Sequence, residues 1–301
     1  MPPNALGSLA SLADLWIGRS ARPDPEALAA VSGRAPAVVV TGASRGIGRA
    51  LARRFAEAGC DVVLVARDEG PLTEAAAEIR RATGVRAVPI PLDVAHADAP
   101  DRLEAGLRAA GLYADVLVNN AGSGLAGPFA DQRTQDLERL MALNIAATTR
   151  LMHHALPAML ARGRGGILNV ASLGGLVPGP YQAAYYASKA YLVSLTEAVA
   201  HEARGRGVRI TAIAPGPVDT TFHSAMGAEG ALYRTLLPAM RAEAVARSAF
   251  LGYRIGRTVI VPGLMPSLAA LAVKLLPHAL SVPLVGALLW VSGPADGRGR
   301  D

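Results

Sequence analysis

A tyrosine and a lysine lie four residues apart in the stretch YYASKAYLVSL, residues 185–195. Residues at positions i and i+4 share one face of a helix, so Tyr185 and Lys189 can meet around one reacting group. A phenol has an unperturbed pKa of about 10, and a neighbouring ammonium lowers that pKa because it favours the phenolate. The spacing therefore indicates a proton-transfer pair, and the competing interpretation is a helix face packed against a core.

A serine and an asparagine upstream are candidates to complete this site. Ser172 ends the apolar run GGILNVAS (165–172), where its hydroxyl could donate to a substrate carbonyl and stabilise developing negative charge. Asn144 lies in a helical pattern although its amide is a weak helix former, and its alternative is a solvent-facing asparagine. Two further tyrosines are not expected to take part in proton transfer. Tyr186 is assigned to packing, and Tyr181 to the border of the substrate cleft.

Three glycines, Gly42, Gly46 and Gly48, separate an apolar run from a helical pattern in VVVTGASRGIGRAL. A tight turn needs residues that accept a positive φ or lack a Cβ, and a pyrophosphate binds at a helix N-terminus. The spacing G-x-x-x-G-x-G differs from the general G-x-G-x-x-G fingerprint. Its place after the first strand of an alternating chain predicts a dinucleotide site, and an ordinary tight turn is the alternative.

The end of the second apolar run, DVVLVAR (61–67), bears on which dinucleotide binds. An NAD site would place a carboxylate there to accept from the ribose 2′-hydroxyl. Here Arg67 ends the run and Arg45 lies in the glycine turn, so two guanidiniums would offer bidentate donors to a 2′-phosphate. We predict a preference for NADP(H) over NAD(H). Asp68 is the counter-evidence, because it could be the acidic residue displaced by one position.

Seven short apolar runs alternate with helical patterns and lack period-two alternation, which is typical of a parallel sheet covered on both faces. We predict a Rossmann-like, doubly wound α/β domain over residues 36–263, with a mostly seven-stranded parallel sheet. Residues 1–35 are assigned to an N-terminal extension and residues 264–301 to an apolar C-terminal extension. The strands are expected at 37–40, 61–67, 86–94, 114–122, 165–172, 208–216 and 257–263, and the main helices at 71–84, 98–110, 132–162 and 183–205.

Composition excludes several classes of protein. Hydrophobic residues make up 51% of the 301 residues, which allows a sizeable core and excludes global disorder. The net charge is +6, but the arginines are scattered without a dense run, so no nucleic-acid partner is expected. A single cysteine and the absence of metal-spaced histidines predict neither a disulfide framework nor a metal site. Without a signal pattern or a spanning apolar run, a cytoplasmic location is expected.

These motifs together resemble the short-chain dehydrogenase/reductase family, in its single-domain Tyr-dependent branch. The resemblance implies an oxidoreductase that interconverts a carbonyl and a secondary alcohol by hydride transfer with NADP(H), acting on a small-molecule substrate as a homodimer or homotetramer. The matching pieces stand in family order over about 36–225, and they are TGASRGIG (41–48), LDV (92–94), NNAG (119–122), Asn144, Ser172, Tyr185-x-x-x-Lys189 and PGPVDT (215–220).

The resemblance also implies a catalytic tetrad of Asn144, Ser172, Tyr185 and Lys189. In it, Tyr185 would be the general acid/base and Ser172 would anchor the substrate carbonyl. Lys189 would lower the pKa of Tyr185 and bond the nicotinamide ribose, while Asn144 would hold a water that links Lys189 to solvent.

A second implied set binds the cofactor. Asp93 and Val94 would hold the adenine, Asn119 would contact the ribose and steady the central strand, and Val218 and Thr220 would orient the carboxamide. The whole cofactor-binding set consists of Gly42, Ser44, Arg45, Gly46, Ile47, Gly48, Arg67, Asp93, Val94, Asn119, Ala121, Gly122, Tyr185, Lys189, Pro215, Gly216, Val218 and Thr220.

Two apolar segments follow this core. The segment after Thr220 would form a flap that favours an apolar substrate, and plain burial of its helix faces is the alternative. The run 264–291 is strongly apolar, and Lys274, Pro277 and Pro283 are expected to break it into pieces too short to span a bilayer. It resembles a subgroup of the family with an apolar C-terminal extension. A dimer interface and a peripheral membrane contact both remain open for it.

Three functions are compatible with these residues. The first is an NADP(H)-dependent carbonyl reductase or alcohol dehydrogenase. The second is a non-catalytic NADP(H)-binding sensor or scaffold, and the third is a membrane-surface reductase of a 3-oxoacyl or sterol-like lipid. The tetrad favours an enzyme, because a sensor has no need of those side chains together.

Overall fold

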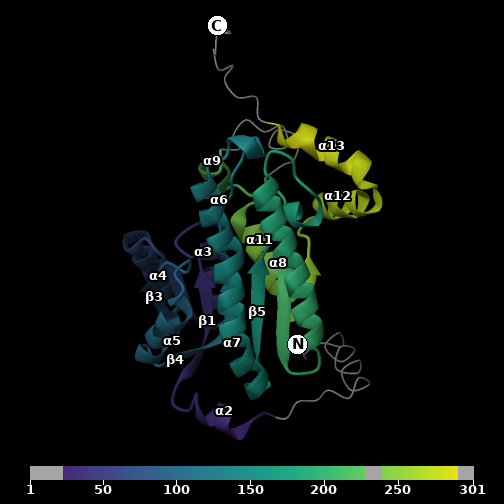
Figure 1. Ribbon diagram of the computed structural model, residues 1–301. Coiled ribbons are helices and arrows are strands. Elements are labelled where there is room, and N and C mark those ends of the chain that lie inside the picture. The colour runs from purple at the N-terminus through teal and green to yellow at the C-terminus, as the bar shows by residue number, and fades with distance from the viewer. Residues whose placement is uncertain (1–22, 228–232, 234–238, 291–301) are drawn as a thin grey trace.

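A seven-stranded parallel sheet forms the centre of the molecule (Figure 1), in the order β3-β2-β1-β4-β5-β6-β7. The computed structural model describes residues 23–227, 233 and 239–290. The fold class predicted from the sequence is confirmed. Strand order reverses between β1 and β4, which places a ligand-binding crevice at their carboxyl ends. The strands are β1 (Ala35–Thr41), β2 (Asp61–Ala66), β3 (Ala87–Pro91), β4 (Leu112–Asn119), β5 (Gly165–Val170), β6 (Val208–Ile213) and β7 (Val259–Ile260).

Helices cover both faces of the sheet, and alternate residues of β1 show why its sequence is continuously apolar. Val38 and Val40 pack toward one face, while Ala37 and Val39 pack toward the other. The helices on the first face are α3 (Gly46–Ala56), α4 (Glu69–Thr83) and α11 (Ala242–Arg254), and those on the second are α5 (Ala99–Ala109), α7 (Thr148–Arg162) and α8 (Ala183–Glu202).

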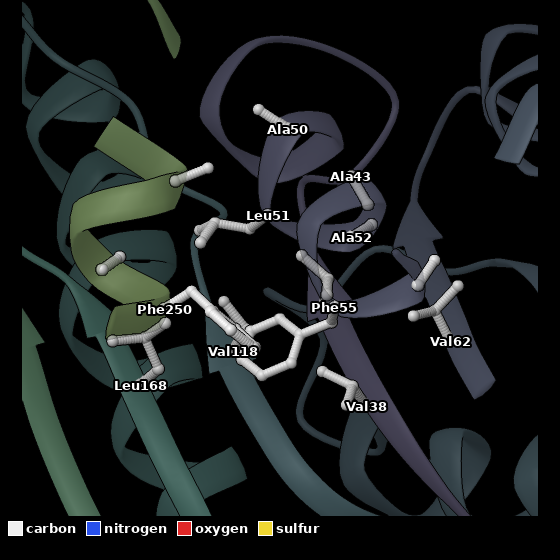
Figure 2. Close-up of a cluster of buried hydrophobic side chains, with 14 of the residues drawn as sticks. Val38, Ala43, Ala50, Leu51, Ala52, Phe55, Val62, Val118, Leu168 and Phe250 are labelled. Atoms are coloured by element: carbon white, nitrogen blue, oxygen red, sulfur yellow. The ribbon is translucent and has the colours of Figure 1, made fainter. Parts of the chain in front are cut away.

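The core on the first face is closed by aromatic contacts between helices. Figure 2 shows Phe55 of α3 and Phe250 of α11 above Val38, Val118 and Leu168 of the sheet. The two phenyl rings meet edge to face, with centroids 5.1 Å apart. This contact holds α3, the helix that follows the glycine turn, against α11 and the sheet.

The long helix predicted over 132–162 is divided in the structure. It consists of α6 (Thr134–Met141), a π-helical segment (Ala142–Ala147) and α7. Pro157 lies inside α7 without ending it. A π-helical segment shifts the register of all later side chains, and such segments occur frequently at functional sites.

The first and last helices of the described residues lie at opposite ends of the molecule (Figure 1). Helix α2 (Pro25–Ala29) precedes the sheet, and the Asp24 N–H donates to the carbonyl of Ala161 in α7. At the other end, α12 (Leu264–Leu275) and α13 (His278–Leu289) form a helical pair. The domain boundaries stay predictions, and their parts in 1–22 and 291–301 lie outside the described residues.

Two details of the C-terminal run differ from expectation. Lys274 lies within α12 and Pro283 within α13, so the prediction that these residues break the run is wrong, and the break is at Leu276 and Pro277. Of the predicted flap, the structure describes residues 221–227, 233 and 239–250, which include α9 (Phe222–Ala225) and the first part of α11, whereas residues 228–232 and 234–238 lie outside the described part. No helix in the described part is long and apolar enough to cross a membrane.

Candidate active site

A cavity of about 860 Å³ opens at the carboxyl ends of the strands. It is lined by the glycine turn after β1, the ends of β2, β4, β5 and β6, and the first half of α8. All the predicted site residues line it except Gly48, Asn119 and Asn144. The sheet therefore brings together side chains that are separated by more than a hundred positions in the sequence.

Tyr185, Lys189 and Ser172 meet at one end of this cavity. Tyr185 and Lys189 are both buried on α8, and the Lys189 Nζ lies 5.8 Å from the centroid of the Tyr185 ring. The same Nζ donates to the carbonyl of Val170 at the end of β5, over 2.9 Å. Ser172, two residues further along, accepts a hydrogen bond from the Gly174 N–H over 3.1 Å. These contacts fix the ammonium and the hydroxyl around the phenol.

Burial controls the ionisation of this pair. It raises the pKa of Tyr185 to about 12, and a hydrogen bond with Ser172 opposes the rise. Burial also lowers the pKa of Lys189 to about 8. In the polypeptide by itself, the pKa of Tyr185 is therefore raised by desolvation and not lowered as expected from Lys189. The phenol is protonated at neutral pH, as a general acid must be.

Asn144 lies in the π-helical segment, behind the cavity wall. It is only 2% exposed, so the solvent-facing alternative is wrong. Its Nδ2 donates to the Ser188 Oγ over 3.0 Å and to the Ser123 carbonyl over 2.8 Å. A Cβ on Gly122 would lie 3.2 Å from the Asn144 Oδ1 and 3.5 Å from the Lys189 Nζ, so the two side chains face the same glycine. Its role in holding a water stays a prediction.

The glycine turn has the geometry that a phosphate cradle needs. Gly42 and Gly46 adopt positive φ angles of 64° and 56°. A Cβ on Gly48 would collide with the Gly42 carbonyl and with the side chain of Asn120. Helix α3 begins at Gly46 without a side-chain cap, so its first N–H groups are left for a ligand. These features fit the pyrophosphate of a dinucleotide.

Charged side chains line the cavity at the end of β2. Arg45 and Arg67 are exposed, and within the described residues neither forms an ion pair. Asp68 lines the same region and makes no side-chain capping bond to α4. The arginines could therefore bind the 2′-phosphate of NADP(H), and Asp68 could accept from the ribose 2′-hydroxyl of NAD(H). In the described residues, no cluster of His, Cys, Asp or Glu could hold a metal ion.

The profile of the short chain dehydrogenase family matches residues 36–230, which is more than half of the 301 residues. The chain belongs to this family of oxidoreductases. Its members bind nicotinamide cofactors, and the glycine cradle fits that class of ligand.

Individual relatives agree with this assignment. A very-long-chain 3-oxoacyl-CoA reductase of Laccaria bicolor is 38% identical over 174 residues, which cover 57% of this chain and 52% of the relative. The chain thus spans about half the length of that relative.

Solved structures of the family hold either cofactor. A short-chain dehydrogenase of Sphingobium yanoikuyae in complex with NADPH is 32% identical, with a TM-score of 0.70 over 79% of this chain and 92% of that one. A short chain dehydrogenase/reductase of Burkholderia phymatum in complex with NAD is 28% identical, with a TM-score of 0.71 over 82% and 94%. Family membership alone therefore does not select NADP(H).

One cofactor residue of this short-chain dehydrogenase needs correction. Asn119 does not line the cavity: it is buried in the sheet, where its Nδ2 donates to the Asn169 Oδ1 of β5 over 2.9 Å. The neighbouring Asn120 lines the cavity, and its Nδ2 donates to the carbonyls of Thr41 and Gly42 over 2.8 and 3.1 Å. Asn120 is the first residue after β4, at the carboxyl end of the strands where doubly wound sheets bind ligands, and that position was the available signal.

Two tyrosines are placed differently from expectation. Tyr186 packs against two apolar clusters, as predicted, but it also lines the cavity, with its ring centroid 6.0 Å from that of Tyr185. Tyr181, predicted to border the cleft, packs against Trp290 instead. The sequence reasoning also missed Gln182, which is buried, lines the cavity and has an Nε2 without a partner in the described structure. Its spacing of three residues before Tyr185 was the available signal.

Proposed function

We propose that this chain is an NADP(H)-dependent carbonyl reductase or alcohol dehydrogenase with an apolar substrate. The single observation that carries the proposal is the meeting of Ser172, Tyr185 and Lys189 in one cavity with the glycine turn. A non-catalytic sensor would not require a buried phenol, an ammonium and a hydroxyl around one point.

The residues divide the chemistry between them. NADP(H) supplies the hydride in reduction and accepts it in oxidation. Ser172 donates a hydrogen bond to the substrate carbonyl oxygen, and Tyr185 gives its proton to the alkoxide that forms. Lys189 holds a positive charge beside the phenol, which stabilises the phenolate left after proton transfer. Asn144 positions a water through which Lys189 exchanges protons with solvent.

The direct test is an NADPH-oxidation assay with the purified chain across aldehydes, ketones, 3-oxo esters and cyclic ketones. We expect at least one class to be reduced, with apolar members favoured. Support for an apolar substrate comes from Val177, Phe222, Met226 and Tyr233, which line the cavity beyond Tyr185. A chain that binds NADPH but oxidises it with no carbonyl would contradict the enzyme and leave the sensor.

The preference for NADP(H) has a separate test. Changing Arg45 and Arg67 together to Ala is expected to raise the KM for NADPH by tenfold or more, because charge-assisted hydrogen bonds to the 2′-phosphate contribute about 1.5–3 kcal/mol each. The KM for NADH should change by less than about threefold. Arg81→Ala, on the exposed side of α4, is the control for loss of surface charge. Equal effects on both cofactors would contradict the assignment and favour Asp68 as the ribose partner.

A peripheral membrane contact is a second proposal, favoured by the outer surface of α12 and α13. Leu275 is 76% exposed, and Met265, Leu268, Leu280, Leu284 and Trp290 are exposed with it. We take the occupant of this surface to be an anionic lipid surface, because the chain carries a net charge of +6. The location proposed for the protein is accordingly the cytoplasm, with part of it at a membrane.

The lipid contact is tested by changing Leu280 and Leu284 together to Glu, because charged side chains do not enter the acyl region. We expect the native chain to sediment with phosphatidylserine vesicles and the variant to remain in the supernatant, with NADPH binding unchanged. Native chain that stays in the supernatant contradicts the proposal. A variant that instead dissociates from a dimer or tetramer in analytical ultracentrifugation would assign this surface to the proposed homo-oligomer.

A further inference from the structure

Helix α13 is docked on the rim of the active site. Gly286 faces Pro180, where an added Cβ would lie 3.3 Å from the proline Cγ. The ring of Trp290, just after the helix, meets the Tyr181 ring edge to face, with centroids 4.8 Å apart. Pro180 and Tyr181 belong to the segment that leads directly into α8 and its Tyr185. Helix α13 and Trp290 are thus attached within a few residues of Tyr185.

The backbone under this contact is held in one conformation. Tyr181 has a φ of 64°, which a residue with a side chain rarely adopts. Its carbonyl accepts a hydrogen bond from the Gly127 N–H over 2.8 Å. Such a conformation persists only where the surroundings determine it. Helix α13 therefore rests on a defined surface rather than on a loose loop.

One face of α13 lines the cavity itself. Val285, Leu288 and Leu289 stand at i, i+3 and i+4, and all three line the same cavity as Tyr185. Val285 is 8% exposed and Leu289 is 3% exposed. With Tyr186 and Tyr233 they form one apolar cluster. Side chains that only completed the hydrophobic core would have no empty space beside them. Val285, Leu288 and Leu289 instead border the open cavity.

We propose that Val285, Leu288 and Leu289 of α13 form the wall that selects the substrate. The wall contacts the apolar body that extends away from the carbonyl held between Ser172 and Tyr185. The substrate class is a ketone or aldehyde with an apolar chain of several carbons. This inference rests on the proposed function and adds the residues that choose among carbonyl compounds.

The test uses a series of 2-alkanones from 2-butanone to 2-dodecanone, with NADPH. In the native chain, kcat/KM should rise with chain length by about fourfold for each methylene buried against the wall. Val285→Phe fills this space, so kcat/KM for 2-dodecanone should fall at least tenfold while that for 2-butanone changes less than twofold. Leu284→Phe, on the exposed side of the same helix, should follow the native profile. A fall of equal size along the whole series, or no change, would overturn the proposal.

Binding separates failure of this proposal from failure of the proposed function. Decanamide has the apolar chain but is not reduced, and its affinity for the NADPH-bound protein can be measured by calorimetry even if no ketone reacts. We expect Val285→Phe to lower the affinity for decanamide at least tenfold and to leave the affinity for NADPH unchanged. If the variant and the native chain bind decanamide equally well, the proposal that α13 forms the wall is overturned. If Val285→Phe does not fold, Val285→Ala replaces it. That variant should shift the preferred ketone toward bulkier chains, and an unshifted preference would count against the proposal.

Discussion

Replacing Tyr185 with Phe is expected to lower kcat for the best carbonyl substrate by about 10²–10⁴-fold, the usual contribution of a positioned general acid. The change removes the hydroxyl that we propose as the proton donor and leaves the ring in place. That ring packs against Phe222 and Tyr186, with centroids 5.6 and 6.0 Å away. The fold should therefore be unchanged. The measurement is single-turnover NADPH oxidation.

Tyr186→Phe is the matched control for this prediction. Tyr186 is the next residue on α8, lines the same cavity and is partly buried. It points to another side of the helix from Lys189, so its loss should change kcat by less than about threefold. Native activity in Tyr185→Phe, or an equal loss in the two variants, would refute the assignment of the proton donor.

Gly48→Ala is expected to weaken NADPH binding by about 10–100-fold and to lower the free energy of unfolding by about 1–3 kcal/mol, as overpacking of a tight site does. The new methyl group would collide with the Gly42 carbonyl and the Asn120 side chain. Neither can move away freely, because Asn120 is itself bonded to Thr41 and Gly42. The turn must shift, and the N–H groups at the start of α3 shift with it. Fluorescence titration with NADPH and thermal unfolding measure the two effects.

Gly70→Ala is the control for the loss of a helical glycine. Gly70 lies in the first turn of α4, with no atom within 4 Å of the position of a new Cβ. Alanine there should leave NADPH affinity unchanged and raise stability slightly, because glycine costs about 0.5–1 kcal/mol relative to alanine in a helix. Native NADPH affinity in Gly48→Ala would contradict the account of the turn.

Much of the fold could be predicted because burial on both faces leaves a direct mark on the sequence. A strand such as Val38–Val40 contacts helices on each side, so every position is apolar and the run stands out from its neighbours. The alternation of such runs with helical patterns then permits few topologies. The π-helical segment at Ala142–Ala147 could not be predicted, since no local pattern separates it from the α-helix on either side.

The proton-transfer site could be predicted because its members are related by local rules. Tyr185 and Lys189 are one helical turn apart, and Ser172 follows a strand end, where doubly wound sheets bind their ligands. Errors arose where the direction of a side chain mattered. Asn119 is the last residue of β4 and is bonded to Asn169 of β5, whereas Asn120 is the first residue beyond the strand. The pairing with β5 decides where β4 ends, and the local sequence does not show it.

By itself, the sequence determined the α/β architecture, the glycine turn and the spacing of the proton-transfer pair, because each depends on residues close together in the chain. Only the tertiary structure decided that burial raises the Tyr185 pKa and that Tyr186 lines the cavity while Tyr181 does not. It alone also decided that α13 returns to the active site, about a hundred residues after Tyr185. Packing an apolar helix against any apolar surface lowers the free energy of the folded chain. The sequence of α13 therefore indicates that the helix is buried but not which surface it packs against. That partner was selected by shape, through the contacts of Gly286 with Pro180 and of Trp290 with Tyr181.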